Sequence, residues 1–216
     1  MNYDIPHQFI AIEGNIGAGK TTLCNMLANT YNCRLVLEQF ADNPFLPYFY
    51  ENAERYAFSV ELFFMTERHK QLQENLSQPN LFQSFLVADY FFVKTLLFAK
   101  NNLNTEEYRL FQRLFTILNS TFPRPDLLVF LHRSIEGLQN NIRKRGRTYE
   151  QEIKDEYLQN IQNVYFEYFR TEQHIPILII DVEEIDFLKS EQHYDMIREA
   201  LSKHYQPGIH HLSFVS

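Results

Sequence analysis

The sequence has 216 residues, of which 45% are hydrophobic, and it carries a formal net charge of −7 at pH 7. This length and apolar content predict a single folded domain over residues 1–216 and exclude a disordered chain. The acidic balance argues against a nucleic-acid partner. Neither Cys24 nor Cys33 has metal-ligand spacing, and no apolar run is long enough to cross a membrane. We therefore expect a reduced, cytoplasmic protein with no membrane partner.

The first predicted element is a short apolar strand at 9–12, which leads through a glycine-rich segment into an amphipathic helix. The segment consists of Gly14, Asn15, Ile16, Gly17, Ala18, Gly19, Lys20, Thr21 and Thr22. Its spacing, with a strand before it and a helix after it, is that of a phosphate-binding loop rather than of a simple glycine-rich turn. Backbone N–H groups and the helix N-terminus would hold phosphate oxygens, with Lys20 on the β- and γ-phosphates and Thr21 on Mg²⁺. We predict that the protein binds a nucleoside triphosphate.

The remaining elements alternate between strands and helices. Strands are predicted at 34–37, 85–88, 127–131 and 177–180, and helices from Asn43 and at about 54–76, 90–102, 105–119, 135–143, 152–171 and 189–204. Ser77–Asn80 breaks the first long helix, and the chain ends in a tail that contains Pro and Gly. The alternation predicts an α/β, P-loop three-layer sandwich, with a five-stranded parallel sheet and helices on both faces.

Acidic side chains follow three of the predicted strands, namely Glu38, Asp89 and Asp181. Ligands of such sheets bind at the carboxyl ends of the strands. Asp89 suits a direct or water-mediated role at Mg²⁺, and Glu38 suits a base that removes a proton from an acceptor hydroxyl. The alternative is that each is a solvated acid at a strand end.

The densest positive charge lies in Arg143, Lys144, Arg145 and Arg147, around Gly146. Such a run is often only a solvated surface. Here it follows a predicted helix in an acidic chain that needs cations for a triphosphate. We interpret residues 143–150 as an arginine-rich lid that neutralises the transferring phosphoryl group and excludes water.

Several segments together resemble the deoxynucleoside kinases, P-loop enzymes that phosphorylate the 5′-hydroxyl of a deoxynucleoside with ATP. They are the phosphate-binding loop, Leu37-Glu38-Gln39 with Asn43-Pro44-Phe45-Leu46, Tyr50–Phe58, the arginine run with Glu150, and Asp186-Phe187. The resemblance extends from about residue 8 to about residue 205. It implies ATP and Mg²⁺ as cofactors, a small-molecule deoxynucleoside as substrate, and a homodimer built through helices, for which the segment 90–102 is a candidate.

The resemblance also implies roles for individual residues. Glu38 would be the catalytic base, and Tyr50 and Glu150 would hold the sugar 3′-hydroxyl. Glu61 and Arg68 match the residues that contact the nucleobase. Arg145 and Arg147 match the lid arginines, with Arg143 as their neighbour. Asp186 and Phe187 match the loop that contacts the donor adenine.

Two positions depart from the family pattern. The family carries an acid-Arg-Ser triplet after the third strand, whereas this chain has Asp89-Tyr90-Phe91. Lys94, about one turn further along, is the candidate for replacing the missing arginine.

The second departure is Glu61, where most relatives carry Gln. An ionised carboxylate only accepts hydrogen bonds, and the guanine edge presents two adjacent donors. With Arg68 donating to O6 and helping to keep Glu61 ionised, we expect a purine deoxynucleoside, deoxyguanosine first. Deoxyadenosine comes second, through a protonated Glu61. The alternative is that Glu61 and Arg68 form an ion pair on a helix surface, without a role in binding.

Two other functions remain open. A nucleoside monophosphate kinase of the thymidylate kinase kind shares the loop and an arginine-rich lid, although Glu38 would repel its anionic acceptor. A catalytically silent nucleotide-binding subunit would explain the missing arginine. It would not explain why Lys20, Thr21, Glu38 and the lid arginines are all present.

Overall fold

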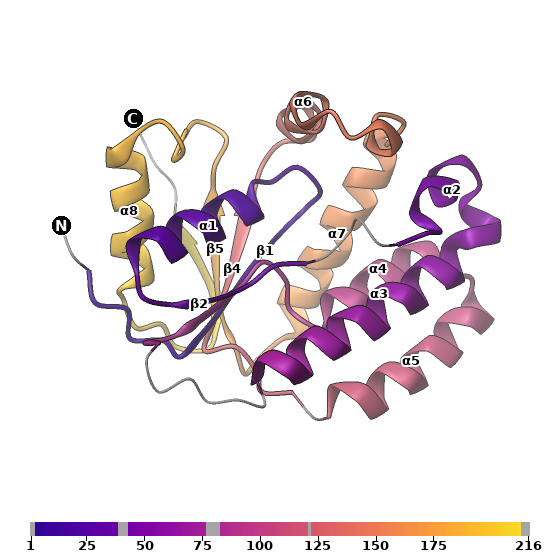
Figure 1. Cartoon of the computed structure of the whole chain (residues 1–216), viewed down its shortest axis with the longest axis horizontal. Coiled ribbons are helices and arrows are strands. Elements are labelled where there is room, and N and C mark those ends of the chain that lie inside the picture. The colour runs from indigo at the N-terminus through magenta and orange to yellow at the C-terminus, as the bar shows by residue number, and fades with distance from the viewer. Residues whose placement is uncertain (1–2, 39–42, 77–82, 121, 213–216) are drawn as a thin grey trace.

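The computed structural model describes residues 3–38, 43–76, 83–120 and 122–212 (Figure 1). Its strands are β1 (Phe9–Gly14), β2 (Arg34–Val36), β3 (Leu86–Ala88), β4 (Leu127–His132), β5 (Pro176–Asp181) and β6 (Gly208–Leu212). Within the described residues they form one six-stranded parallel sheet in the order β2-β3-β1-β4-β5-β6. The crossover between β1 and β3 places the carboxyl end of β1 next to those of β3 and β4.

The predicted α/β class and parallel sheet are confirmed, but the strand number was wrong. β6 lies in the tail for which no element was predicted, and it pairs with β5 from Pro176↔Gly208 to Ile180↔Leu212. It is an edge strand whose residues alternate between half-buried and exposed. A strand with one neighbour needs few apolar residues, so its Gly-Ile-His-His-Leu sequence gave little hydrophobic signal.

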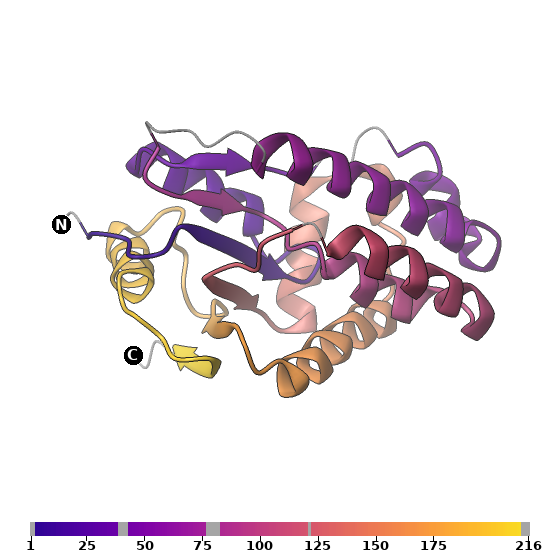
Figure 2. The same cartoon turned by 90° about the horizontal axis from the view of Figure 1, so that it is seen from below.

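Helices cover both faces of the sheet, as Figures 1 and 2 show. They are α1 (Lys20–Thr30), α2 (Leu46–Glu51), α3 (Ala53–Leu76), α4 (Lys94–Asn102), α5 (Thr105–Asn119), α6 (Ile135–Arg145), α7 (Asp155–Thr171) and α8 (Glu191–Leu201), with a 3₁₀ turn η1 (Thr148–Glu150). Side chains of α1, α6 and α8 pack on one face, and those of α3, α4, α5 and α7 on the other. This is the expected three-layer arrangement. Gln39 and the predicted helix break Ser77–Asn80 lie outside the described residues.

The two apolar clusters lie on opposite sides of β1. Ile10 and Ile12 belong to the cluster with α1 and α8, whereas Phe9 and Ala11 belong to the cluster with α3, α4, α5 and α7. This alternation follows from the period of two in a strand, and burial of both faces explains why the β1 sequence is almost entirely apolar. The packed centre of the sheet gives the segments that follow β1, β2 and β3 a rigid base.

Two further findings concern the helices. The segment expected to form a dimer interface, now α4, packs against α3, α5 and α7, and its Leu97 and Ala99 are buried. The exposed apolar side chains of this region are instead Leu110 and Ile117 on α5. Among the described residues, none of the helices combines the length and the apolar character that crossing a membrane requires.

Candidate active site

The loop between β1 and α1 has the backbone of an anion cradle. Gly17 and Gly19 have φ of 84° and 98°, a region that L side chains rarely adopt. A Cβ atom at Gly17 would also lie 2.8 Å from the carbonyl oxygen of Leu138. Asn15 Nδ2 donates to the Leu158 carbonyl at 2.7 Å, and Asn141 Nδ2 donates to the Gly17 carbonyl at 2.8 Å. The loop is therefore anchored to both α6 and α7.

Lys20, the first residue of α1, bends back over this loop. Its Nζ donates to the carbonyls of Gly14 and Asn15, each at 2.9 Å. Burial, with a further contribution from the nearby Lys94 cation, lowers the pKa of Lys20 to about 8. An anionic phosphate placed in the cradle would reverse this shift, because it favours the charged ammonium.

Thr21, Asp89 and Glu38 meet where β1, β2 and β3 end. Thr21 Oγ1 donates to Asp89 Oδ2 at 2.6 Å, and the Glu38 N–H donates to Asp89 Oδ1, also at 2.6 Å. Burial and the neighbouring Glu38 raise the pKa of Asp89. A hydroxyl beside a carboxylate is an all-oxygen donor set, which suits Mg²⁺. Asp181 lies elsewhere, at the end of β5, where its Oδ2 is 3.7 Å from His132 Nδ1.

Glu38 is buried between two cations. Arg68 Nε donates to Glu38 Oε1 at 2.6 Å, and Lys94 Nζ donates to Oε2 at 2.5 Å. Burial alone would raise the pKa of Glu38, but Arg68 and Lys94 outweigh it and hold that pKa well below its usual range. The side chain is therefore an ionised carboxylate throughout the neutral pH range.

The structure explains how the chain accommodates Asp89-Tyr90-Phe91 in place of the acid-Arg-Ser triplet. Tyr90 is fully buried, and its hydroxyl donates to Gln71 Oε1 on α3 at 3.0 Å. Lys94 on α4 supplies the positive charge at Glu38 instead. The chain thus holds two cations at this carboxylate without an arginine at position 90.

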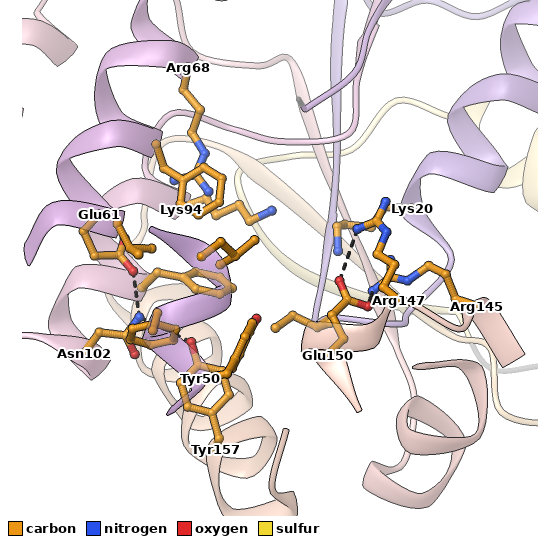
Figure 3. Close-up of a pocket in the computed structure, with 16 residues that line it drawn as sticks. Lys20, Tyr50, Glu61, Arg68, Lys94, Asn102, Arg145, Arg147, Glu150 and Tyr157 are labelled. Atoms are coloured by element: carbon orange, nitrogen blue, oxygen red, sulfur yellow. Dashed lines mark hydrogen bonds and ion pairs between the residues drawn. The ribbon is translucent and has the colours of Figure 1, made fainter. Parts of the chain in front are cut away.

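A pocket lies between the loop, the lid and helices α2, α3, α4 and α7. Its lining comprises Ile16, Lys20, Leu46, Phe49, Tyr50, Val60, Glu61, Phe64, Arg68, Lys94, Phe98, Asn102, Arg145, Arg147, Glu150 and Tyr157. Figure 3 shows Lys20, Arg145 and Arg147 on one side and Glu61, Asn102 and Tyr157 on the other. Cationic side chains therefore line one side of the pocket, and a carboxyl, an amide and a phenol line the other, which are polar groups that could orient a small molecule.

Glu61 and Arg68 both line the pocket, as expected, but they bind different partners. Arg68 binds Glu38 and donates through Nη1 to Thr95 Oγ1 at 3.0 Å. Glu61 Oε1 accepts instead from Asn102 Nδ2 at 2.6 Å (Figure 3). Burial raises the pKa of Glu61 to about 7, against the lowering effect of Arg68. Arg68 therefore does not keep Glu61 fully ionised, because desolvation is the larger effect.

The lid begins inside a helix rather than after one. Arg143, Lys144 and Arg145 form the last turn of α6, which ends at Gly146 with φ of 71°. Arg145 and Arg147 both pair with the buried carboxylate of Glu150, the latter at 3.1 Å. Arg143 is exposed, binds Asn140 at 2.6 Å and is not part of the pocket lining. Glu150 therefore holds both pocket arginines, besides the sugar-binding role expected of it.

The residues expected to contact the sugar and the donor adenine, Tyr50, Asp186 and Phe187, lie in different parts of the structure. Tyr50 lines the pocket and stacks on Tyr149 at a centroid distance of 6.3 Å. Phe187 is buried and packs against Gly19, where an added Cβ would lie 3.3 Å from its ring. Asp186 is exposed, and its Oδ1 accepts from the backbone N–H groups of Leu188 and Lys189. Phe187 thus supports the phosphate loop, and Asp186 shapes its own turn.

Asn102 and Tyr157 line the pocket although the sequence did not identify them as site residues. One signal for Asn102 was present, because Lys94, Phe98 and Asn102 follow an i, i+4, i+8 spacing and so share one face of α4. Tyr157 lies in the predicted helix at about 152–171, and nothing in its sequence context indicated that its hydroxyl faces the pocket.

Comparisons with known proteins agree with this geometry. The family model described as deoxynucleoside kinase matches residues 10–206. A deoxyguanosine kinase of Bacillus subtilis is 31% identical over 193 residues, which cover 88% of this chain and 93% of the relative. A deoxyadenosine kinase of Dictyostelium discoideum is 33% identical over 192 residues, covering 88% of this chain and 77% of that protein.

Solved structures show the same fold. The deoxyadenosine kinase from M. mycoides with bound dATP superposes with a TM-score of 0.77 at 23% identity, covering 91% of this chain and 100% of that one. Together, the P-loop, the buried acid at the end of β2 and the family match over nearly the whole length show that the chain belongs to the deoxynucleoside kinase family.

Proposed function

We propose that this kinase transfers the γ-phosphoryl group of ATP to the 5′-hydroxyl of a purine deoxynucleoside, with deoxyguanosine preferred. The observation that carries the proposal is the position of Glu38. Glu38 is an ionised, buried carboxylate that is bound by Arg68 and Lys94, two cations that line the pocket. Lys20 and the lid arginines lie at one side of this pocket, and Glu61 lies at the other side (Figure 3). Such a pocket suits a neutral acceptor with a hydroxyl at one end and a hydrogen-bonding ring at the other.

In this mechanism the cradle and Lys20 bind the β- and γ-phosphates, and Glu38 accepts a hydrogen bond from the 5′-hydroxyl. The low pKa of Glu38 is compatible with this role, because phosphoryl transfer has a loose transition state in which the hydroxyl loses its proton late. Arg145 and Arg147 would stabilise the charge on the transferring group when they move from Glu150 to phosphate oxygens. Mg²⁺, held by Thr21 and Asp89, would neutralise phosphate charge.

The base preference rests on Glu61. A carboxylate oxygen that only accepts matches the N1–H and 2-amino donors of guanine better than the carbonyls of thymine. Arg68 donates to Glu38 and Thr95, but its guanidinium carries five N–H groups, so a further N–H group could donate to O6. The deoxyguanosine kinase of Bacillus subtilis, among the similar relatives, supports the same choice.

The two other functions are less well supported. A monophosphate acceptor would bring a phosphate next to the ionised Glu38, which is unfavourable at low dielectric. A silent subunit was suggested by the missing arginine, but Lys94 provides the charge at that carboxylate. The family match and the kinase relatives also favour a deoxynucleoside kinase. Mg²⁺ dependence, a homodimer and a cytoplasmic location remain predictions.

The test is a panel of acceptors offered with ATP. It includes the four common deoxynucleosides and their 5′-monophosphates, with product formation followed chromatographically. We expect deoxyguanosine to give the highest kcat/KM, followed by deoxyadenosine, and the monophosphates to be inert. Turnover of a monophosphate alone would support the thymidylate kinase kind, and ATP binding without any transfer would support the silent subunit.

A further inference from the structure

Asn102 holds one of the two carboxylate oxygens of Glu61. Its Nδ2 donates to Glu61 Oε1 at 2.6 Å and to the Tyr157 hydroxyl at 3.3 Å, while its Oδ1 accepts from Asn101 Nδ2 at 2.9 Å. These contacts turn the amino side of the Asn102 amide toward Glu61. Because that group only donates, Oε1 is used as an acceptor, and a proton on Glu61 belongs on Oε2.

The second oxygen, Oε2, is the one left for a ligand. It is buried and has no hydrogen-bond partner among the described residues, and Glu61 lines the pocket. A buried polar atom without a partner is costly and is an unusual feature of a folded protein. An ionised Glu61 offers Oε2 as an acceptor, whereas a protonated Glu61 offers it as a hydroxyl donor. One proton therefore reverses the hydrogen-bonding character of this point in the pocket.

The two purine bases differ in the same way at ring position 1. Guanine carries N1–H, a donor, and adenine carries an unprotonated N1, an acceptor. Each base has an amino group next to N1 on the same edge, and this donor can use the remaining lone pair of Glu61 Oε1. At this edge, guanine and adenine are therefore distinguished by the hydrogen bond between N1 and Glu61 Oε2.

We propose that the Asn102-held carboxyl of Glu61 is a proton-dependent base selector, which accepts deoxyguanosine when ionised and deoxyadenosine when protonated. The inference rests on the proposed function and deepens it, because it replaces a fixed preference with one that pH sets. Asn102 acts as a positioning residue that directs the proton to Oε2.

The charges around Glu61 support two populated states near neutral pH. Burial raises the pKa of Glu61 to about 7, and the lowering effects of Arg68, Asn102 and Lys94 are partly offset by Glu38. Tyr157 on α7 stays neutral, because burial and Glu61 raise its pKa. Across the pocket the lid charges face one another, with Arg145 and Arg147 paired to Glu150. Small changes of pH therefore change the charge of Glu61.

The test is a competition between deoxyguanosine and deoxyadenosine in one reaction with ATP, run from about pH 6 to about pH 8. At equal concentrations of the two nucleosides, the initial product ratio equals the ratio of the two kcat/KM values and is insensitive to pH effects common to both substrates. If the two substrates need opposite protonation states, the ratio rises in favour of deoxyguanosine by about tenfold per pH unit. A ratio that does not change with pH, with both products formed, overturns the selector and leaves the proposed function intact. Absence of both products overturns the proposed function itself.

Variants connect the effect to the two side chains. Glu61→Gln cannot ionise, so its product ratio should be independent of pH and should favour deoxyadenosine. Asn102→Ala removes a donor that stabilises the charged form, so its ratio at each pH should shift toward deoxyadenosine. Asn160→Ala, an exposed asparagine on α7, is the matched control and should reproduce the wild-type ratio. A wild-type ratio in Asn102→Ala would overturn the positioning role.

Discussion

Replacement of Glu38 by glutamine tests the catalytic base without changing the size of the side chain. The carboxylate accepts from Arg68 at 2.6 Å and from Lys94 at 2.5 Å, and its side chain is 1% exposed. Glutamine can still accept from one cation, but it cannot take the proton of the 5′-hydroxyl. We expect kcat to fall by roughly 10²–10⁴-fold, which corresponds to about 3–5 kcal/mol in the activation free energy.

The same substitution should lower stability, because it leaves two buried cations with no anion between them. Breaking a buried pair by removal of one partner costs about 3–5 kcal/mol. At about 2–4 °C per kcal/mol for a domain of this size, Tm should fall by roughly 10 °C. Steady-state kinetics must therefore be measured well below this Tm, with ATP binding measured by calorimetry to show that the P-loop is intact.

Glu167→Gln provides the matched control. Glu167 pairs with Lys100 at 2.6 Å on the surface, with both side chains about half exposed, and its replacement should leave kcat and Tm close to wild type. If Glu38→Gln keeps more than about a third of the wild-type kcat while binding ATP normally, Glu38 does not act as the base.

Three further predictions concern the cations around the phosphoryl group. Arg145→Ala or Arg147→Ala should lower kcat more than it raises the KM for the nucleoside, because these charges act on the transition state; a change in KM alone would reassign them to binding. Lys94→Met should reduce kcat, because it removes a cation that binds Glu38. Tyr90→Phe should lose only a hydrogen bond worth about 1 kcal/mol of stability. Equal kinetics for the two variants would leave the Asp89-Tyr90-Phe91 departure without an explanation. ATP binding should raise the depressed pKa of Lys20, so the protein should take up protons when it binds ATP between about pH 8 and about pH 9. Calorimetry would detect this uptake as a dependence of the binding enthalpy on the buffer. The absence of such a dependence would show that the lysine does not change its charge.

The parts of the site that the sequence predicted are those set by local chemistry. The spacing of glycines around Lys20 and Thr21 defines a loop whose backbone shape depends on few distant residues, so the motif locates the phosphate end. The acids Glu38 and Asp89 were expected together because strand ends of a parallel sheet share one edge. The hydrogen bond from the Glu38 backbone N–H to Asp89 Oδ1, at 2.6 Å, follows from that topology.

What the sequence did not predict depends on competition among buried groups. Glu61 and Arg68 are seven residues apart on α3, which made an ion pair between them plausible. In the fold, Glu38 comes from a different element and takes the guanidinium, and Asn102 from α4 takes the Glu61 carboxylate. Side-chain partners over such separations are decided by packing, which a helical spacing does not encode. The edge strand β6 was missed for a simpler reason, because two histidines, one half-buried and one exposed, replace part of the apolar run that a central strand has.

The position of the new phosphate ester tests the central claim most directly. Deoxyguanosine and ATP are incubated with the enzyme, and the product is identified by ³¹P–¹H correlation NMR. Lys20 and the lid arginines lie at one side of the pocket and Glu61 at the other, and Glu38 is bound by the pocket residues Arg68 and Lys94; this arrangement predicts a 5′-monophosphate and ADP in equal amounts. Esterification at the 3′-hydroxyl, or hydrolysis of ATP with the nucleoside unchanged, would contradict the account.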